Sequence, residues 1–331
     1  MPRSIGFVLL LLLICTFSTA QNQDEVFAGP HIDKLIGEGK YPEAYDFLKD
    51  GIAKNTAMKT YSATYYAGMG KFFIEVGQMK DAADALKAAD SVASQSGMGN
   101  ANTARETAAL LLAQGDYSGA ATWAGKAVRE SSYRKARKIE MAYCVSLEAL
   151  ARLRSGDLKR AVKLITTALR DVPKDNDSEP LFASRVLFTA CLIESHQGNY
   201  TAGQEFCRRG LEVVERKKID SRDVSLAHLA LAESYFLSGD LARSREFISK
   251  SMEHTAKMFQ PTHQDTVSAL DLLARVDLKE SKPADAQTHA QAALDMAITV
   301  FGDGTGGTKG PQKTLQEVKK ATGKQPVCAS S

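Results

Sequence analysis

The chain has 331 residues, of which 44% are hydrophobic and 24% are charged, and 42 basic residues against 39 acidic ones give a formal net charge of +3. This is an ordinary soluble composition. No long block of one charge sign occurs, which excludes the electrostatic footprint of a nucleic-acid-binding protein, so no nucleic-acid partner is expected.

The first twenty residues have the layout of a secretory signal peptide. Arg3 precedes an apolar stretch from Ile5 to Phe17, and the small residues Ser18, Thr19 and Ala20 follow it. The stretch is shorter than the roughly 20 residues that a membrane-spanning helix needs, which disfavours an uncleaved anchor. Residues 1–20 therefore predict export to the periplasm or the exterior, with cleavage after Ala20 and no transmembrane segment in the mature chain.

A turn segment returns seven times between residues 25 and 301, at intervals of 38 to 42 residues. This period is typical of repeats that consist of a pair of helices. Small side chains recur seven residues before the turns and five and twelve residues after them, which lets two antiparallel helices pack closely. The pattern predicts an all-α solenoid of about seven antiparallel helix pairs. The turn residues are Gly39, Gly77, Gly115, Gly156, Gly198, Gly239 and Ser281.

The chain after the repeats divides into three short segments. Residues 302–310 are rich in glycine and predict a flexible linker. Residues 311–322 place Leu315 and Val318 on one helical face, which predicts a helix that caps the exposed end of the last repeat. Residues 323–331 are expected to be disordered.

No group of residues indicates catalysis, a cofactor or a metal. Gly302, Gly304 and Gly307 have the spacing of a dinucleotide-binding loop, but they follow a predicted helix instead of a strand. The six histidines show no metal-binding spacing, and no H-E-x-x-H or G-x-S-x-G segment occurs. We therefore expect a protein without enzyme activity and without a cofactor.

The repeated unit, a helix, a three-residue turn and a second helix with small contact residues, resembles the tetratricopeptide repeat family. The resemblance covers residues 25–301, and the longer late units, most visibly from Pro261 to Gly302, resemble the form found in kinesin light chains. Pro173 lies where the family often places a helix-ending proline. The aromatic residue expected near the start of each first helix is mostly missing, with Tyr66 the clearest example. The resemblance implies a right-handed superhelix.

In such a superhelix the first helices line a concave face. Residues thirteen, ten, six and three positions before the turns share one side of those helices, and they mix leucines, aromatics and arginines. This mixture predicts a groove for an extended or helical peptide with apolar side chains and some acidic character. The alternative is that the apolar residues pack against the next repeat. The candidate groove residues are Arg105, Tyr143, Arg185, Phe188, Leu192, Leu229, Glu233, Phe236 and Arg275.

Cys191 and Cys207 lie seven residues before and nine residues after Gly198, which places them opposite each other in a folded helix pair. A disulfide is one interpretation, if the compartment is oxidising. Two buried, unbonded side chains are the favoured alternative. Cys144 and Cys328 are expected to be unpaired.

The sequence predicts an exported, non-catalytic scaffold that binds a partner peptide or protein on the concave face of the superhelix. The alternative is a carrier or chaperone-like module that holds a small molecule or an unfolded polypeptide in the groove. A large, strongly apolar, enclosed pocket would favour that alternative.

Overall fold

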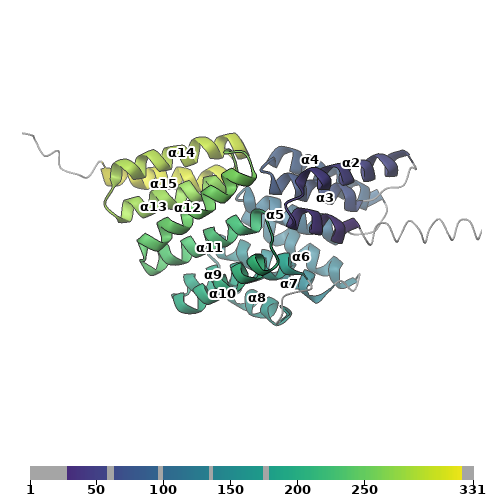
Figure 1. Ribbon diagram of the computed structural model, residues 1–331, viewed down its shortest axis with the longest axis horizontal. Helices are drawn as coiled ribbons and strands as arrows, with labels where there is room; N and C mark the ends of the chain where they lie inside the picture. The colour runs from purple at the N-terminus through teal and green to yellow at the C-terminus, as the bar shows by residue number, and fades with distance from the viewer. Residues whose placement is uncertain (1–27, 58–62, 96–99, 134–136, 174–178, 323–331) are drawn as a thin grey trace, which may run out of the picture.

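A computed structural model describes residues 28–57, 63–95, 100–133, 137–173 and 179–322 (Figure 1). These residues form helices joined by short turns, with no strand among them. They are arranged as seven antiparallel pairs and one final helix, so the prediction of an all-α solenoid is confirmed. The predicted signal peptide, residues 1–20, and the predicted tail, residues 323–331, lie outside the described ranges.

The helix pairs follow one another along the chain without interruption. The first pair consists of residues 28–37, which are helical, and α2 (Tyr41–Ala57). The second, third and fourth pairs are α3 (Ala63–Glu75) with α4 (Met79–Gln95), α5 (Ala101–Ala113) with α6 (Tyr117–Tyr133), and α7 (Lys138–Arg154) with α8 (Leu158–Leu169). The fifth, sixth and seventh pairs are α9 (Pro180–His196) with α10 (Tyr200–Arg216), α11 (Arg222–Ser238) with α12 (Leu241–Met258), and α13 (Gln264–Lys279) with α14 (Pro283–Phe301). The last helix is α15 (Gly306–Thr322).

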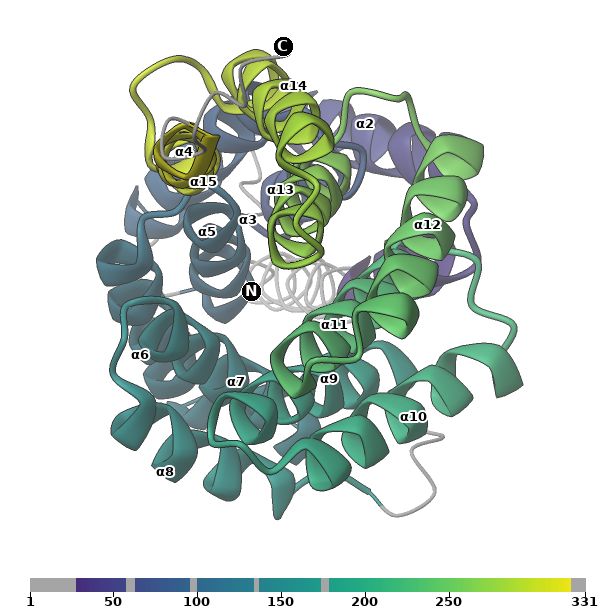
Figure 2. The ribbon, with the colours of Figure 1, turned by 90° about the vertical axis from the view of Figure 1, so that its left-hand side faces the viewer.

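The pairs stack into a superhelix whose two ends meet (Figure 2). Figure 2 shows α3, α5, α7, α9, α11 and α13 on the inner side and α4, α6, α8, α10 and α12 on the outer side. Figure 1 shows α12 to α14 beside α2 to α4, although the two sets lie far apart in the sequence.

The seven predicted turn residues all have a left-handed backbone, with φ between 60° for Ser281 and 89° for Gly156. A glycine adopts this conformation without a steric penalty, whereas an L-residue with a Cβ does not. Ser281 is the only one of the seven with a side chain.

Replacing Ser281 by glycine is therefore expected to stabilise the protein, by up to about 1 kcal/mol, because it removes the Cβ from a left-handed position. Urea denaturation of the variant measures the change. Gly156→Ala is the reverse control: a Cβ there would meet nothing within 4 Å, so any loss of stability comes from the backbone alone. Equal stability of both variants and the native chain would contradict the explanation.

The small residues predicted at the helix contacts are buried, except Gly51, which is half-buried. The positions that follow each turn by five residues are typical. Six of them are 0% exposed: Ala44, Ala82, Ala120, Ala161, Ser244 and Ala286. Ile32 is the one large residue among the predicted small positions, and it meets Gly68 on α3, where a Cβ would lie 2.7 Å from the Ile32 side chain. The larger side chain is thus accommodated by a glycine on the neighbouring helix.

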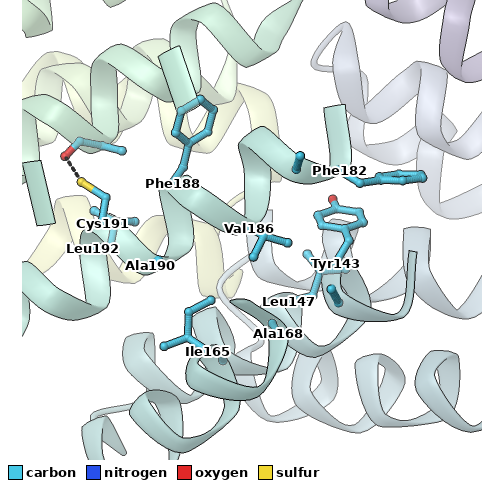
Figure 3. Close-up of a cluster of buried hydrophobic side chains, with 14 of the residues drawn as sticks. Tyr143, Leu147, Ile165, Ala168, Phe182, Val186, Phe188, Ala190, Cys191 and Leu192 are labelled. Atoms are coloured by element: carbon cyan, nitrogen blue, oxygen red, sulfur yellow. Dashed lines mark hydrogen bonds between the residues drawn. The ribbon is translucent and has the colours of Figure 1, made fainter. Parts of the chain in front are cut away.

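The packing between units is shown by the fourth and fifth pairs (Figure 3). The ring of Tyr143 on α7 stacks on Phe182 of α9, with centroids 5.2 Å apart and planes at 18°. Ile165 from α8 and Val186 from α9 are 2% and 0% exposed in the same cluster. Each first helix therefore packs against its own partner and against the next unit.

A disulfide joins Cys191 on α9 to Cys207 on α10, with Cα atoms 5.2 Å apart. The structure thus has the bonded arrangement and not the favoured interpretation of two free side chains. Gly203 brings the two helices close, because a Cβ there would lie 2.8 Å from the carbonyl oxygen of Cys191. Cys144 is buried and free, whereas Cys328 lies outside the described ranges.

The final helix begins earlier than the sequence predicts. The predicted linker covers residues 302–310, yet α15 begins at Gly306. A Cβ on Gly306 would lie 2.4 Å from the carbonyl oxygen of Gln114, and one on Gly307 would lie 2.5 Å from the ring of Phe301. These glycines therefore allow close packing of the helix start and do not form a flexible linker.

The rest of α15 covers the last pair. Leu315 and Val318, the residues predicted to face the repeats, are 5% and 0% exposed. They pack in one cluster with Ala274 of α13 and with Ala286 and Ala290 of α14. None of the helices in the described ranges is both long enough and apolar enough to cross a bilayer.

Candidate binding cavity

The two ends of the superhelix are docked on each other, and we call the contact between them the seam. The seam joins the first three interhelical turns, at Gly39, Gly77 and Gly115, to three later segments: Asp220 before α11, His263 before α13, and Gly306 at the start of α15. Each turn thus meets the start of a helix five units further along the chain.

The docked turns require glycine for a second reason besides their backbone conformation. A Cβ on Gly39 would lie 2.4 Å from the carbonyl oxygen of Asp220, and one on Gly115 would lie 2.5 Å from the carbonyl oxygen of Gly306. By contrast, a Cβ on Gly156, Gly198 or Gly239 would meet nothing within 4 Å. Close approach of the two ends therefore distinguishes the first three turns from the next three.

Hydrogen bonds to the end of α3 hold the seam. Gln264 donates from Nε2 to the carbonyl oxygen of Ile74 at 2.6 Å, and Nε2 of His263 lies 3.0 Å from the carbonyl oxygen of Glu75. These carbonyls lie at the C-terminus of α3, where the regular helical bonds end. The carbonyl of Ile74 also accepts from the backbone N–H of Gly77 at 3.3 Å. The seventh unit thus caps a helix of the second unit.

A buried ionic cluster lies beside these bonds. Arg185 on α9 contacts Glu75 of α3 at 2.8 Å and Asp223 of α11 at 2.7 Å, and it also bonds to the hydroxyl of Tyr143 at 3.3 Å. Burial alone would raise the pKa of Glu75, but the guanidiniums of Arg185 and Arg222 hold it below its usual range. The cluster therefore keeps its charges ionised, and it joins four units around one guanidinium.

The seam borders a half-open cavity of about 410 Å³ on the concave face. Its wall combines first-helix residues of the third to seventh units with residues of the seam, including Ile74, Glu75, Gln264 and Phe301. Leucines supply much of the apolar wall: Leu112, Leu147, Leu150, Leu192, Leu226, Leu229 and Leu272. The volume lies in the range of sites that hold drug-sized ligands.

Seven of the nine residues predicted for the groove line this cavity: Tyr143, Arg185, Phe188, Leu192, Leu229, Glu233 and Arg275. The other two are core residues. Arg105 is 7% exposed, donates to Glu106 at 2.8 Å and stacks on Phe182, and Phe236 is 5% exposed in a hydrophobic cluster with Leu272.

Two of the three arginines that are expected to contact a partner instead pair with carboxylates of this chain. The sequence predicts that Arg105, Arg185 and Arg275 contact acidic groups of a partner. Arg105 instead pairs with Glu106, and Arg185 is neutralised within the chain as described above. Arg275 is the one of the three without an ion pair to a carboxylate of the described residues.

Phe188 belongs to both the wall and the core. A Cβ on Gly210 of α10 would lie 2.4 Å from its ring, so the ring fills a gap in the fifth pair. Removing this ring would leave a void in the core and lower stability. Half-buried leucines such as Leu229 are therefore better positions for testing the cavity.

The seam residues of the wall carry no local signal in the sequence. Glu75 and Gln264 are polar residues at a helix end and a helix start, which is an ordinary place for them. Gln264 reaches the end of α3 only because the superhelix brings it to Ile74, 190 residues away in sequence. Among the segments at the seam, the glycine-rich stretch at 302–310 is the one that stands out in the sequence, and its composition predicts a linker.

His263 lies fully buried in the seam with both ring nitrogens in use. Nδ1 accepts a hydrogen bond from the backbone N–H of Asp265 at 3.1 Å, which caps α13, and Nε2 donates to Glu75. The ring stacks on Phe259 at 4.8 Å. Burial lowers the pKa of His263, and the charge of Arg222 lowers it further. The effect of burial is larger than that of the Asp265 carboxylate, which acts to raise the pKa.

The stability of the protein is therefore expected to fall as the pH drops from about 6.5, where histidine titrates in an unfolded chain. The folded state prefers neutral His263, so this contribution is complete above the unfolded pKa and is lost as the pH falls toward the lower folded pKa. Thermal unfolding between pH 5 and 7.5 measures the slope. His263→Asn, which keeps a helix-capping side chain, should unfold at a lower temperature at pH 7 and show a flatter slope.

His228 provides the comparison for this slope. Burial lowers its pKa to about 4, and it packs against Phe247, away from the seam. His228→Gln should remove only its own share of the pH dependence. A His263→Asn variant with the full slope of the native chain would show that His263 does not titrate on unfolding.

The stacked helix pairs and the cavity define the chain as a helical-repeat solenoid protein. Residues 223–299, which lie in the sixth and seventh pairs, match the family model of the tetratricopeptide repeat. The resemblance to the tetratricopeptide repeat family is thus confirmed, and the described chain has the fold of these proteins. No curated protein matches the chain.

Solved structures share the fold at low sequence identity. The complex of NprR with its cognate peptide NprX is 13% identical, with a TM-score of 0.57, and the match covers 94% of each chain. A Rap protein complexed with competence and sporulation factor is 12% identical, with a TM-score of 0.53, over 92% of this chain and 99% of that chain. The APC/C hetero-tetramer Cut9–Hcn1 is 11% identical, with a TM-score of 0.55, over 87% of this chain, which spans only 48% of that chain. At these identities the likeness shows the fold alone.

Proposed function

We propose that the protein is a non-catalytic interaction scaffold that binds a peptide or a protein segment in the cavity. The observation that carries the proposal is the cavity itself, whose wall draws half-buried apolar side chains and charged groups from the first helices of five units. Short segments with apolar anchors and a few polar contacts fit such a wall. Two neighbours in fold, NprR and Rap, are described as complexes with a cognate peptide and with a named factor, which supports a peptide ligand.

The wall also bears on the carrier alternative. A strongly apolar pocket would favour a small-molecule carrier, yet ion pairs cross this wall. Arg154 of α7 and Glu233 of α11 form two bonds of 2.7 Å, and Arg185 pairs with Glu75. A peptide backbone offers hydrogen-bonding groups to such a mixed wall, which an apolar small molecule does not.

Affinity selection from a library of N-acetylated hexapeptides tests the proposal. The native chain is expected to retain apolar peptides, and Leu229→Gln is expected to reduce their retention about tenfold, because a polar side chain enters the wall. Leu211→Gln is the matched control, since Leu211 is also half-buried but lies on α10, away from the cavity. Thermal unfolding confirms that both variants fold. Failure of the native chain to retain any peptide would contradict peptide binding in the cavity.

We further propose that the protein is exported and that residues 1–20 are removed. The apolar stretch before Ala20 supports this, and so does the disulfide, since such bonds persist in oxidising compartments. N-terminal sequencing of the protein from the exported fraction of its own cells should give Gln21 as the first residue. A protein that keeps Met1 and stays with the cytosolic fraction would overturn the proposal.

A further inference from the structure

Four arginines line the cavity, and three of them already have carboxylate partners within the chain. These three pair as follows: Arg154 with Glu233 at 2.7 Å, Arg185 with Glu75 at 2.8 Å and with Asp223 at 2.7 Å, and Arg222 with Asp265 at 2.7 Å. Each of these guanidiniums is already neutralised by a carboxylate of the chain, so it has little net attraction left for a carboxylate of a ligand. Breaking such a buried pair would leave the carboxylate of the chain without its cation.

Arg275 on α13 is the fourth, and it differs from the others. No carboxylate in the described ranges forms an ion pair with it. Its guanidinium lies over the ring of Phe236, 4.6 Å from the ring centre, and the ammonium of Lys279 lies 4.1 Å from the same ring. The aromatic ring holds the guanidinium in place but does not neutralise it.

The acidic residue one turn earlier on the same face of α13 does not form an ion pair with Arg275. Asp271 lies one turn before Arg275 and bonds to Thr314 of α15. Burial raises the pKa of Asp271, while the positive charge of Arg275 acts to lower it. Asp271 forms no direct ion pair with Arg275, so no carboxylate of the described residues bonds to this guanidinium.

Apolar residues line the cavity on the helix of Arg275 and on the helix beside it. Leu272 of α13 and Leu226 and Leu229 of α11 line the cavity on the same two helices. A charge at the edge of such a surface interacts more strongly with an opposite charge than it would in water, because the local dielectric is lower. The site thus combines an apolar surface with one cation.

We propose, on the basis of the function proposed above, that the bound segment is mainly apolar and carries one carboxylate, which forms an ion pair with Arg275. The carboxylate comes from an aspartate or glutamate side chain or from the C-terminus of the segment. Both sources present two oxygens to the guanidinium and allow two parallel hydrogen bonds.

Two hexapeptide libraries test this inference and distinguish the sources. Both are N-acetylated; one ends in an amide and the other in a free carboxylate. With the amide library, the native chain is expected to enrich apolar peptides that contain one aspartate or glutamate by about tenfold over their asparagine or glutamine counterparts. If the carboxylate comes from the C-terminus, the native chain should retain apolar peptides of the free-carboxylate library whether or not they contain an aspartate or glutamate.

Variants assign the effect to Arg275. Arg275→Gln should still retain apolar peptides but lose the preference for a carboxylate, whereas Arg275→Lys should keep part of it. Arg209→Gln is the matched control, because Arg209 also lies over an aromatic ring, Phe206, but on α10 and outside the cavity wall. It should keep the full preference.

The outcomes separate this inference from the function on which it rests. Retention of apolar peptides by the native chain with no preference for a carboxylate in either library would overturn the role of Arg275 and leave peptide binding intact. A preference for a carboxylate that persists in Arg275→Gln would likewise overturn the role of Arg275 and leave peptide binding intact. Retention of no peptide at all would overturn both.

Discussion

Arg185→Gln is expected to lower the free energy of unfolding by about 3–5 kcal/mol, the largest effect of any single substitution considered for this chain. The substitution leaves Glu75 and Asp223 buried, at 1% and 0% exposure, without the cation that now lies between them. An uncompensated buried carboxylate is far more costly than a lost surface ion pair. Because Arg185 joins the second, fourth, fifth and sixth units, the loss affects the seam as well as the fifth unit.

Urea denaturation at pH 7 measures this change, and the pH dependence tests its cause. In the native chain Glu75 has a lowered pKa, so its contribution to stability is present at neutral pH and is lost as the pH falls. In the variant Glu75 should instead take up a proton more readily, because the Arg185 guanidinium no longer lowers its pKa, so the difference between variant and native chain should shrink at pH 4 to 5. Arg208→Gln, which removes exposed ion pairs with Glu205 and Glu212, should change stability little. A difference that does not depend on pH would point to lost packing.

Removing the disulfide is expected to have the second largest effect, a loss of about 3 kcal/mol for a closed loop of this size. The bond links Cys191 and Cys207, which are 16 residues apart in sequence, and it thereby restricts the unfolded chain. The Cys191→Ala, Cys207→Ala double variant removes the bond without leaving a free thiol. Its midpoint in urea should lie well below that of the oxidised native chain.

Reduction provides the control for this prediction. Dithiothreitol should lower the midpoint of the native chain toward that of the double variant and leave the double variant unchanged. Both cysteines are 0% exposed, so the reduction requires partial unfolding and should be slow under native conditions. An oxidised chain no more stable than its reduced form would contradict a stabilising bond.

The repeat pattern of the sequence predicts the local architecture well, for a physical reason. A turn between antiparallel helices needs a left-handed residue, and closely packed helices need small contact residues, so both requirements leave a mark at fixed spacings. Gly77 and Ala82 illustrate the two: the first has φ of 83° and the second is fully buried. Such constraints act within one unit, and a single sequence records them.

The seam and the charges of the cavity could not be predicted in the same way. The contact between Gly77 and His263 depends on the small rotation from each unit to the next, summed over five units, and no residue encodes that sum by itself. The pairing of Arg185 follows from the same closure, since its partner Glu75 lies 110 residues earlier. A sequence pattern can place an arginine on the concave face, but it cannot say whether a carboxylate from a distant unit already neutralises it.

The five-unit offset of the seam also fixes the number of repeats. In most solenoids a unit can be duplicated or lost because each repeat contacts only its neighbours. Here an extra unit between α6 and α11 would move every seam partner by one position, so that Gly39 would no longer face Asp220 and Gly77 would no longer face His263. Such a chain would keep its local helix pairs and lose its closure. Repeat number in this protein is thus constrained in the way that subunit number is constrained in a closed ring.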